Sequence, residues 1–506
     1  MSIYLCYDVK GIQSYIFNIP KLKYIVGGSA LIDQFDKETI KNLKIPGTEH
    51  VFSGGGKGTF RCESQSHVNA LKQEIIDKAH HIGLDIRFGQ NENFSQAAQH
   101  ADELYSFVPE MHDGYPCPES GLYPTKPGQK RHPVIQKRLY KSGEKVFRRF
   151  EELLLTDVLI PGKSNEELEF FHNVNTDDMD GIDGASALGN RNRWAVISMD
   201  GNDMGMQFRA QVKNGLSPDE MQTWIQKMSK ALDEITVSAA SAGIQRVVSE
   251  WAGSDKGKQA IVKKGKVTLP IRPLVVGGDD IVVICHNAYA ITFVKEVVRV
   301  FELTSRKNSE LWPATKGRLT ITAGILFAPV TLPLHTAIPY SESLLASAKS
   351  RGRKNATNGE ASPACIDWEQ ITDTVVDTPA AKRQRELLYF DQEIKRTVKL
   401  TQRPYTMEAF STVENLAQLY GHDRQHKLPR TIRHKILPAL QKGYAQRLAF
   451  SAQIKKNHPD LFNAINEFEM ANSSWELNGD KTEQSIKLID ALMLLEEDSR
   501  MEKETV

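Results

Sequence analysis

Hydrophobic and polar positions follow the same order of strand-like and helix-like periods twice along the chain. Two-residue alternation and short apolar runs predict strands, and apolar positions three or four residues apart predict helices. The first series is a strand at 3–9, helical segments from residue 11, two strands around a glycine turn at 49–62, a helix at about 64–83 and a strand at 84–89. The second series is a strand at 194–200, a long helical region that includes 217–235, a hairpin at 273–285, a helix at 288–307, a strand at 318–328 and a helix at 337–354. These series predict an α+β fold with an internal duplication.

The stretch between the two series and the stretch after the second differ from both. Prolines and glycines cluster within 109–192, which predicts irregular loops. The acidic run at 177–183 lacks the glutamate that a calcium loop needs. Residues 379–506 show helical periods and no strand pattern. We therefore predict four domains, with the bounds 1–110, 111–192, 193–375 and 376–506.

Composition and charge limit the class of protein. The 506 residues are 40% hydrophobic and 25% charged, which is typical of a soluble globular protein of several domains. A formal net charge of +1 predicts no general attraction to nucleic acid or membranes, and no run of about 18 apolar residues is present to span a membrane. The five cysteines form no Cys-x-x-Cys pair, so we expect no disulfide framework and a cytoplasmic location. The basic stretch 421–457 either contacts nucleic acid or forms a solvated helix face.

The motif GGDD at 277–280 is the strongest chemical signal in the sequence. Gly-Gly and Asp suit a tight type I′ hairpin turn, which would explain the motif without any chemistry. However, apolar residues on both sides predict two central strands, and the carboxylates of Asp279 and Asp280 repel each other unless a cation lies between them. Magnesium prefers one or two carboxylates together with substrate phosphates. The sequence therefore predicts a cation site at this turn, where Gly277 and Gly278 leave room for a nucleotide.

A third carboxylate follows the first strand of the same domain. In MDGNDMG, Asp200 ends the strand and Gly201 permits a close backbone approach. Because the first strand in this order of elements lies beside the hairpin, we expect Asp200 to meet Asp279 and Asp280 around two divalent cations, as in phosphoryl transfer. Lys349, on the helix after the last strand, either neutralises a triphosphate or is a solvated surface lysine.

Together these motifs resemble those of the Cas10 proteins, the large subunits of type III CRISPR effectors. The combination of a GIQ signature with GGDD is specific to that family. The segments that carry the resemblance extend over most of the chain and are DVKGIQSYIFNIPKLKYIVGGSALI at 8–32, FSGGGKGTF at 52–60, CPESGLYP at 117–124, WAVISMDGNDMG at 194–205, PLVVGGDDIVVI at 273–284, LTITAGILFA at 319–328, LLASAKSRGR at 344–353 and KLPRTIRHKILPAL at 427–440.

The resemblance implies two ferredoxin-like palm domains, at 1–110 and 193–375, and a C-terminal helical domain. It implies that ATP, with Mg²⁺ or Mn²⁺, is joined 3′ to 5′ into cyclic oligoadenylate second messengers in antiviral defence. The expected partners are CRISPR subunits with crRNA and target RNA, and no membrane. By the same resemblance the catalytic residues are Asp200, Asp279 and Asp280, the metal is held by these three with Gly201, and one nucleotide binds at Gly54, Gly55 and Gly56. From the residues themselves we expect the other nucleotide at Gly201, Gly277, Gly278 and Lys349.

Three departures from the family pattern limit what the resemblance implies. No HD nuclease domain precedes the first palm domain, so DNA cleavage is not expected. Cys117 stands alone where the family often has a four-cysteine zinc site, so no zinc is expected. Asn202 replaces an aspartate, which leaves the product type and the metal occupancy open. Two alternatives to a guide-RNA-dependent synthetase remain: a stand-alone synthetase, which could be a homo-oligomer, and a catalytically silent scaffold subunit.

Overall fold

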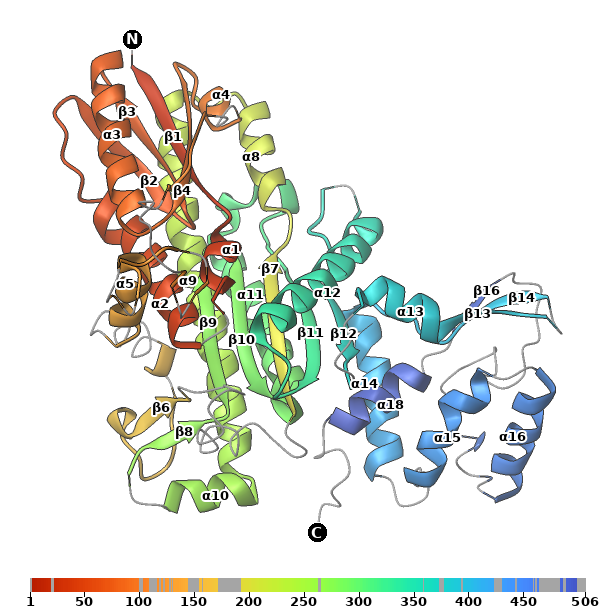
Figure 1. The fold of residues 1–506 in the computed structure, drawn as a ribbon. Coiled ribbons are helices and arrows are strands. Elements are labelled where there is room, and N and C mark those ends of the chain that lie inside the picture. Colours follow the sequence, from red (N-terminus) through yellow and green to blue (C-terminus); the bar gives the residue numbers. More distant parts are fainter. Residues whose placement is uncertain are drawn as a thin grey trace.

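The chain forms two large sheets, each packed against helices, with smaller C-terminal elements beside the second sheet (Figure 1). The acidic run at 177–183 lies outside the residues that the structure describes. The computed structural model describes residues 2–19, 22–99, 103–108, 116–117, 120–121, 123–126, 129, 131–143, 154–156, 158–171, 193–262, 265–357, 359–372, 377–392, 395–422, 430–441, 444–457, 459, 462–463, 483–485 and 488–497.

The first palm domain contains a five-stranded antiparallel sheet with the order β2-β3-β1-β4-β5. The strands and helices that the sequence pattern predicts in this part of the chain are present. They are β1 (Ile3–Lys10), α1 (Ile12–Phe17), α2 (Leu22–Gln34), the π-helix η1 (Phe35–Ile40), β2 (Thr48–Gly54), β3 (Lys57–Cys62), α3 (Gln65–His81), β4 (Asp85–Asn91), α4 (Phe94–Gln99) and β5 (Glu103–Tyr105).

The second palm domain contains a six-stranded sheet with the order β15-β12-β11-β7-β10-β9. Its long helix α9 begins at a capping box, because the side chains of Ser217 and Glu220 each bond the backbone of the other residue. The elements are β7 (Arg193–Gly201), α8 (Met204–Lys213), α9 (Pro218–Ala252), α10 (Asp255–Val262), β9 (Ile271–Gly277), β10 (Asp280–His286), α11 (Ala290–Ser305), β11 (Ile321–Pro329), α12 (Leu334–Asn355), β12 (Cys365–Gln370) and β15 (Tyr405–Thr406), with the short helices η4 (Asn287–Tyr289), η5 (Arg306–Leu311) and η6 (Pro313–Thr315).

The two sheets share one strand order. In the first sheet β1 lies between β3 and β4, and β2 pairs with β3. In the second sheet β7 lies between β10 and β11, and β9 pairs with β10. In both, therefore, the first strand is flanked by the third and the fourth, which is the ferredoxin-like order. The α+β fold class is confirmed, and the common order supports the predicted internal duplication.

The connecting segment packs on both palm domains. Helix α5 (Pro133–Gly143) packs against α2, and β6 (Leu168–Phe170), after the short helix η2 (Asn165–Glu167), pairs in parallel with β8 (Val267–Leu269) beside α10. The C-terminal part contains α13 (Pro379–Leu387), α14 (Met407–His422), α15 (Arg430–Leu440), α16 (Tyr444–Asn457) and α18 (Leu488–Glu497), with the strands β13 (Leu388–Asp391), β14 (Arg396–Lys399) and β16 (Glu483–Ser485).

The prediction that residues 379–506 contain no strand is wrong. Strands β13, β14 and β16 form a three-stranded sheet, and β15 extends the sheet of the second palm domain by pairing with β12. Each of these strands has only two to four residues. The alternation of apolar and polar residues is recognised over about four to eight residues. Strands as short as these therefore show no clear alternation.

Each face of the second sheet is covered by a different apolar cluster. Alternate β7 residues such as Ala195 and Ile197 face α9 and α11, whereas Trp194 and Val196 face α12 and the first palm domain. The first palm domain therefore shares a core with one face of the second sheet. Among the described residues, no helix combines the length and the apolar character that crossing a membrane requires.

Two adjacent glycines of α2 give a test of the packing between α2 and α5. A Cβ on Gly27 would lie 1.9 Å from the carbonyl oxygen of Arg138 on α5, whereas a Cβ on Gly28 would meet its nearest atom, Ile16 Cα, at 3.5 Å. We expect Gly27→Ala to lower the free energy of unfolding by about 2 kcal/mol or more, since backbone atoms must move apart. Gly28→Ala is the matched control. There the higher helix propensity of alanine offsets about 1 kcal/mol of any loss in the free energy of unfolding. Equal thermal unfolding midpoints for the two variants would contradict this packing.

Candidate functional site

Asp200 and Asp280 are direct cross-strand neighbours. The antiparallel pairing of β7 with β10 places Asp280 opposite Asp200, and the register continues without a break to the far end of β10. Because side chains alternate along a strand, Asp200 shares its face with Val196, and Asp280 shares its face with Val282. Both valines belong to the apolar cluster that α12 and the first palm domain cover. The two carboxylates therefore lie on the face of the sheet that the two palm domains share.

The turn between β9 and β10 contains two residues, Gly278 and Asp279, because Gly277 pairs with Asp280. Of the two, only Gly278 has a positive φ, at +60°. The type I′ turn, which would have explained the motif without chemistry, is not formed, since that type needs positive φ at both central residues, and the observed values suit type II′. This geometry explains why a glycine precedes Asp279 in the motif.

The prediction that both hairpin strands are central is correct for β10 and wrong for β9, which is the edge strand of its sheet. The apolar side chains of β9 are nevertheless buried, because α2 of the first palm domain packs against this strand and Leu274 joins the shared cluster. An edge strand that another domain covers can therefore have the same apolar composition as a central strand.

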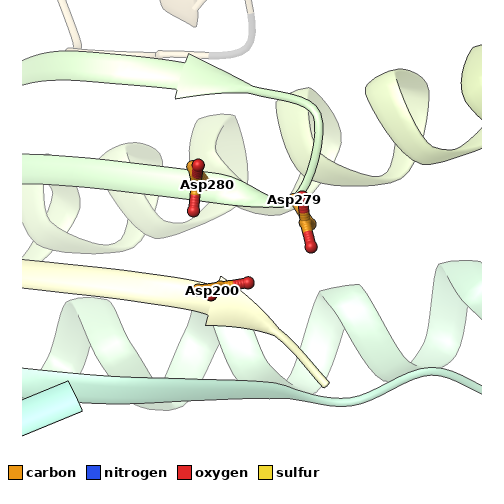
Figure 2. Close-up of side chains that lie close together, drawn as sticks. All are labelled: Asp200, Asp279 and Asp280. Atoms are coloured by element: carbon orange, nitrogen blue, oxygen red, sulfur yellow. The ribbon is translucent and has the colours of Figure 1, made fainter. Parts of the chain in front are cut away.

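The three predicted aspartates meet at one point. Asp200, Asp279 and Asp280 each offer one carboxylate oxygen, and these three oxygens lie within 4.8 Å of one another. Figure 2 shows the three side chains grouped where β7 ends and where the hairpin turn leads into β10. Carboxylate oxygens are the ligands that Mg²⁺ and Mn²⁺ prefer. The donor set therefore fits a divalent cation.

Backbone contacts hold the turn against the end of β7. The amide of Gly201 donates to the carbonyl oxygen of Asp279 at 3.1 Å, and the hydroxyl of Thr236 on α9 donates to the carbonyl oxygen of Gly278 at 2.6 Å. A Cβ on Gly201 would lie 2.9 Å from the Cβ of Asp279, so this approach requires a glycine. The sequence predicted the close approach at Gly201, and it gave no signal for Thr236.

Burial and mutual repulsion raise the pKa values of two of the carboxyl groups. Burial, and then the charges of Asp200 and Asp280, raise the pKa of Asp279 to about 8. Burial, and then the charge of Asp200, raise the pKa of Asp280 to about 6, while the charge of Lys349 opposes both shifts. Lys349 on α12 forms an ion pair with Asp200 and donates to the carbonyl oxygen of Gly201 at 2.9 Å. Its alternative interpretation as a solvated surface lysine is therefore wrong.

A fourth carboxylate of this region escaped the sequence analysis. Glu342 lies on α12, seven residues before Lys349, and so on the same helix face. Its Oε1 is buried and accepts no hydrogen bond. Burial, and then the charge of Asp280, raise the pKa of Glu342 to about 7. The seven-residue spacing was the only signal in the sequence, and it is also common on ordinary amphipathic helices.

Asn202, which replaces the aspartate of the family pattern, has a structural contact. Its side chain is buried, and its amide donates to the hydroxyls of Thr320 and Thr322 at 2.8 and 2.9 Å. The next residue, Asp203, has a left-handed φ of +64° and accepts hydrogen bonds from the amide and the hydroxyl of Ser362. These contacts fix the turn from β7 into α8 and leave Asp200 as the carboxylate that this turn directs to the site.

The glycine turn of the first palm domain has a different geometry. Gly54 pairs with Lys57, and the central residues Gly55 and Gly56 both have positive φ, at +63° and +77°, as a type I′ turn requires. A Cβ on Gly55 would meet no atom within 4 Å, so the tip of this turn is open. The Asp200–Asp280 pair has a counterpart at the same register position in this domain. There Asp8 lies opposite Lys57, and the charged groups of the two side chains are 4.0 Å apart.

Asp36, on the π-helix η1, holds this first turn in place. Its carboxylate accepts hydrogen bonds from the amide of Gly56 at 2.6 Å and from the hydroxyl of Tyr7 at 3.0 Å. Its own carbonyl oxygen accepts from the hydroxyl of Ser53 at 2.7 Å. Burial raises the pKa of Asp36 to about 7, although the bonds from Gly56 and Tyr7 oppose the shift. Asp36 has no local signature in the sequence, because it is 20 positions away from the turn.

Comparison with known proteins gives a match in the second half of the chain. The family model of the Cas10/Cmr2 second palm domain matches residues 193–358. This segment contains β7, the GGDD hairpin and α12, and so all three aspartates and Lys349. The resemblance to Cas10 that the motifs indicate is therefore confirmed. No curated protein matches the sequence.

Solved structures of Csm1 share the fold. Csm1 from T. onnurineus has 15% sequence identity and a TM-score of 0.53, with 98% of this chain and 69% of that chain covered. A Csm1–Csm4 cassette in complex with one ATP has 13% identity, a TM-score of 0.51 and the same coverage. A Csm1–Csm4 cassette in complex with cA3 has 13% identity and a TM-score of 0.50, again with 98% and 69% covered. At these identities the likeness shows the fold.

The buried carboxyl of Asp36 predicts a dependence of stability on pH. Its pKa lies near 4 in the unfolded chain and at about 7 in the folded chain. The folded state therefore binds this proton more tightly, so its contribution lowers the free energy of unfolding as the pH rises from about 4 to about 7. In Asp36→Asn this loss is absent, so the thermal midpoint of the wild type should fall relative to that of the variant between pH 5 and pH 8.

Asp33→Asn is the control for this measurement, because Asp33 is a half-exposed carboxylate three residues earlier that pairs with Lys37. Its thermal midpoint should follow that of the wild type at both pH values. The same pH dependence in Asp36→Asn and the wild type would contradict the assignment.

Proposed function

Because residues 193–358 form a Cas10/Cmr2 second palm domain, we propose that this chain is a nucleotidyltransferase that joins ATP 3′ to 5′ into cyclic oligoadenylates. The observation that carries the proposal is the convergence of Asp200, Asp279 and Asp280 at a single point beside Lys349. Crowded carboxylates raise one another's pKa values, which is an unfavourable arrangement for a purely structural turn. A divalent cation relieves it, and this favours an enzyme over a silent scaffold.

The three aspartates are proposed to hold Mg²⁺ or Mn²⁺, with the carbonyl oxygen of Gly201 as a further ligand. When bound, such cations lower the pKa of a ribose hydroxyl and neutralise a triphosphate and its leaving pyrophosphate. Lys349 contacts the Asp200 carboxylate and the Gly201 carbonyl oxygen directly, so it would exchange these partners for phosphate oxygens when the cation and the nucleotide bind.

The glycine turns are proposed to receive the two nucleotides. A Cβ on Gly277, Gly278 or Gly55 would meet no atom within 4 Å, so each position has open space for a ligand close to the backbone. One nucleotide would lie at Gly277 and Gly278 beside the aspartates, and the other at Gly54, Gly55 and Gly56 of the first palm domain. Csm1–Csm4 cassettes in complex with one ATP and with cA3 share this fold, which supports ATP as the substrate and a cyclic oligoadenylate as the product.

The proposed partners are other CRISPR subunits, with crRNA and target RNA as the activating nucleic acids. The structurally similar cassettes are complexes of Csm1 with Csm4, which supports a subunit partner. Activity of the purified chain without RNA would instead identify a stand-alone synthetase.

The direct test is product formation from labelled ATP with Mg²⁺ or Mn²⁺, for the chain alone and in its complex with guide and target RNA. We expect Asp279→Asn and Asp280→Asn each to lower the rate on the order of 100-fold or more, because a lost charge weakens transition-state stabilisation. Their thermal midpoints should not fall, since the neutral amides remove repulsion. Asp77→Asn, at an exposed position of α3, is the matched control. A wild type without product under every activator, or variants as active as the wild type, would refute the proposed function.

A further inference from the structure

Polar residues form a stripe along one side of α9. They recur at alternating spacings of three and four, which places them on one helix face. Each of these residues lies against the first palm domain or against the hairpin of the second. We define the α9 stripe as Asp219, Gln222, Gln226, Ser229, Asp233 and Thr236.

The first half of the stripe follows the outer strands of the first palm domain. The carboxylate of Asp219 pairs with Arg61 of β3 at 3.2 Å. The amide of Gln222 donates to the carboxylate of Glu49 on β2 at 3.2 Å. One turn further along, the amide of Gln226 donates to the carbonyl oxygen of Val51, also on β2, at 2.7 Å. The helix therefore fixes the position of β2, which leads into the first glycine turn.

The second half of the stripe contacts both glycine turns. A Cβ on Gly54 would lie 3.7 Å from the hydroxyl of Ser229, so the first turn lies against this point of α9. Asp233 pairs with Lys37 at 3.5 Å. Lys37 directly follows Asp36, whose carboxylate holds the amide of Gly56.

Thr236 ends the stripe at the GGDD turn. Its side chain is 0% exposed, and its hydroxyl donates to the carbonyl oxygen of Gly278 at 2.6 Å. Asp279 is the next residue, and the amide of Gly201 holds its carbonyl oxygen from the other side. The turn is therefore held between β7 and α9, and Thr236 is the contact on the α9 side.

Thr236 follows Ser229 by seven positions of one continuous helix, about two turns, which corresponds to about 10 Å of axial rise. A helix is stiff over this length, so the first glycine turn and the GGDD turn are held at a fixed separation. The apolar cluster that the two palm domains share packs without directed bonds, and such packing permits sliding more readily than hydrogen bonds do.

We propose that α9 is the spacer that keeps the two nucleotides in register for bond formation, and that Thr236 is the positioning residue of the GGDD turn. The kinetic part of this inference rests on the proposed function. Thr236 would contact neither nucleotide nor cation. It would act through the backbone of Gly278 on the orientation of Asp279.

The kinetic test uses three variants of the full chain under the conditions that activate the wild type. Thr236→Val keeps the shape and removes the hydroxyl, and we expect kcat to fall by roughly 10- to 100-fold, the scale of a displacement of about 1 Å. KM for ATP should stay within about threefold, because the groups that bind ATP remain. Thr236→Ser keeps a hydroxyl and should restore most of kcat.

Thr223→Val is the matched control, because Thr223 is an exposed residue of the same helix. Among the described residues its hydroxyl bonds only the carbonyl oxygen of Asp219, one turn earlier in that helix. Its kcat should equal that of the wild type. Equal kcat for Thr236→Val and the wild type, or equal losses in Thr236→Val and Thr236→Ser, would overturn the assignment of Thr236.

Hydrogen exchange of the same variants tests the positioning without any activity. Peptides that span residues 274–281 should exchange faster in Thr236→Val than in Thr223→Val and the wild type, while peptides from β11 remain unchanged. Unchanged exchange at 274–281 would overturn the inference even if kcat falls. Faster exchange together with a wild type that forms no product would refute the proposed function and leave the positioning role of Thr236 intact.

Discussion

The antiparallel register between β7 and β10 is the constraint on which the rest of the structure depends. It places Asp280 opposite Asp200 and sends both side chains to the face that the two palm domains share. A slip of one residue would turn every β10 side chain to the other face. Val282 and Ile284 would then point to the cluster around α9 and α11, and Ile281 and Val283 would point to the first palm domain. The slip would also move Asp280 away from Asp200, so the register is what brings the carboxylates together.

This arrangement has an energetic cost that the neighbouring elements must offset. Burial raises the pKa values of Asp279 and Asp280, so their ionised forms are unfavourable in the folded chain without a cation. Lys349 compensates for part of the negative charge from α12. The turn itself is held by two directed bonds, from Gly201 on β7 and from Thr236 on α9. The carboxylates are thus fixed by three different elements, and no one of them can relax alone to separate the charges.

The sequence predicted the parts of the site that have a local signature. Asp200, Asp279 and Asp280 follow or precede apolar strands, and the order of elements is enough to place those strands side by side. The position of Lys349 on the helix after the last strand made it a candidate for the site. Its alternative interpretation as a solvated surface lysine could be rejected only from the fold. Asp36, Thr236 and Glu342 could not be predicted, because each acts on a turn or strand 20 to 62 positions away along the chain. Such contacts depend on how helices cross the sheets, and residue periodicity does not encode this.

The edge position of β9 and the small C-terminal strands were missed for a related physical reason. An apolar run indicates that a strand is buried, and β9 is buried because α2 of the other palm domain covers it. The run therefore does not show whether the strand lies at the edge or in the centre of its sheet. Strands β13 to β16 have two to four residues, too few to show alternation. The sequence therefore predicts elements whose environment lies within one domain better than those completed by another part of the chain.

The two palm domains share a strand order and differ in charge at the same register position. Where the second domain has Asp200 opposite Asp280, the first has Asp8 opposite Lys57. A lysine opposite an aspartate neutralises it within the pair, whereas two aspartates need an external cation. Gly56 stands where Asp279 stands in the other turn, and its amide is held by the buried carboxylate of Asp36. The duplication has thus given one turn that concentrates negative charge and one that leaves an open, charge-balanced backbone. Only the former is suited to metal-assisted chemistry, so a reaction between two nucleotides at this interface would be asymmetric, with activation on the side of the second domain.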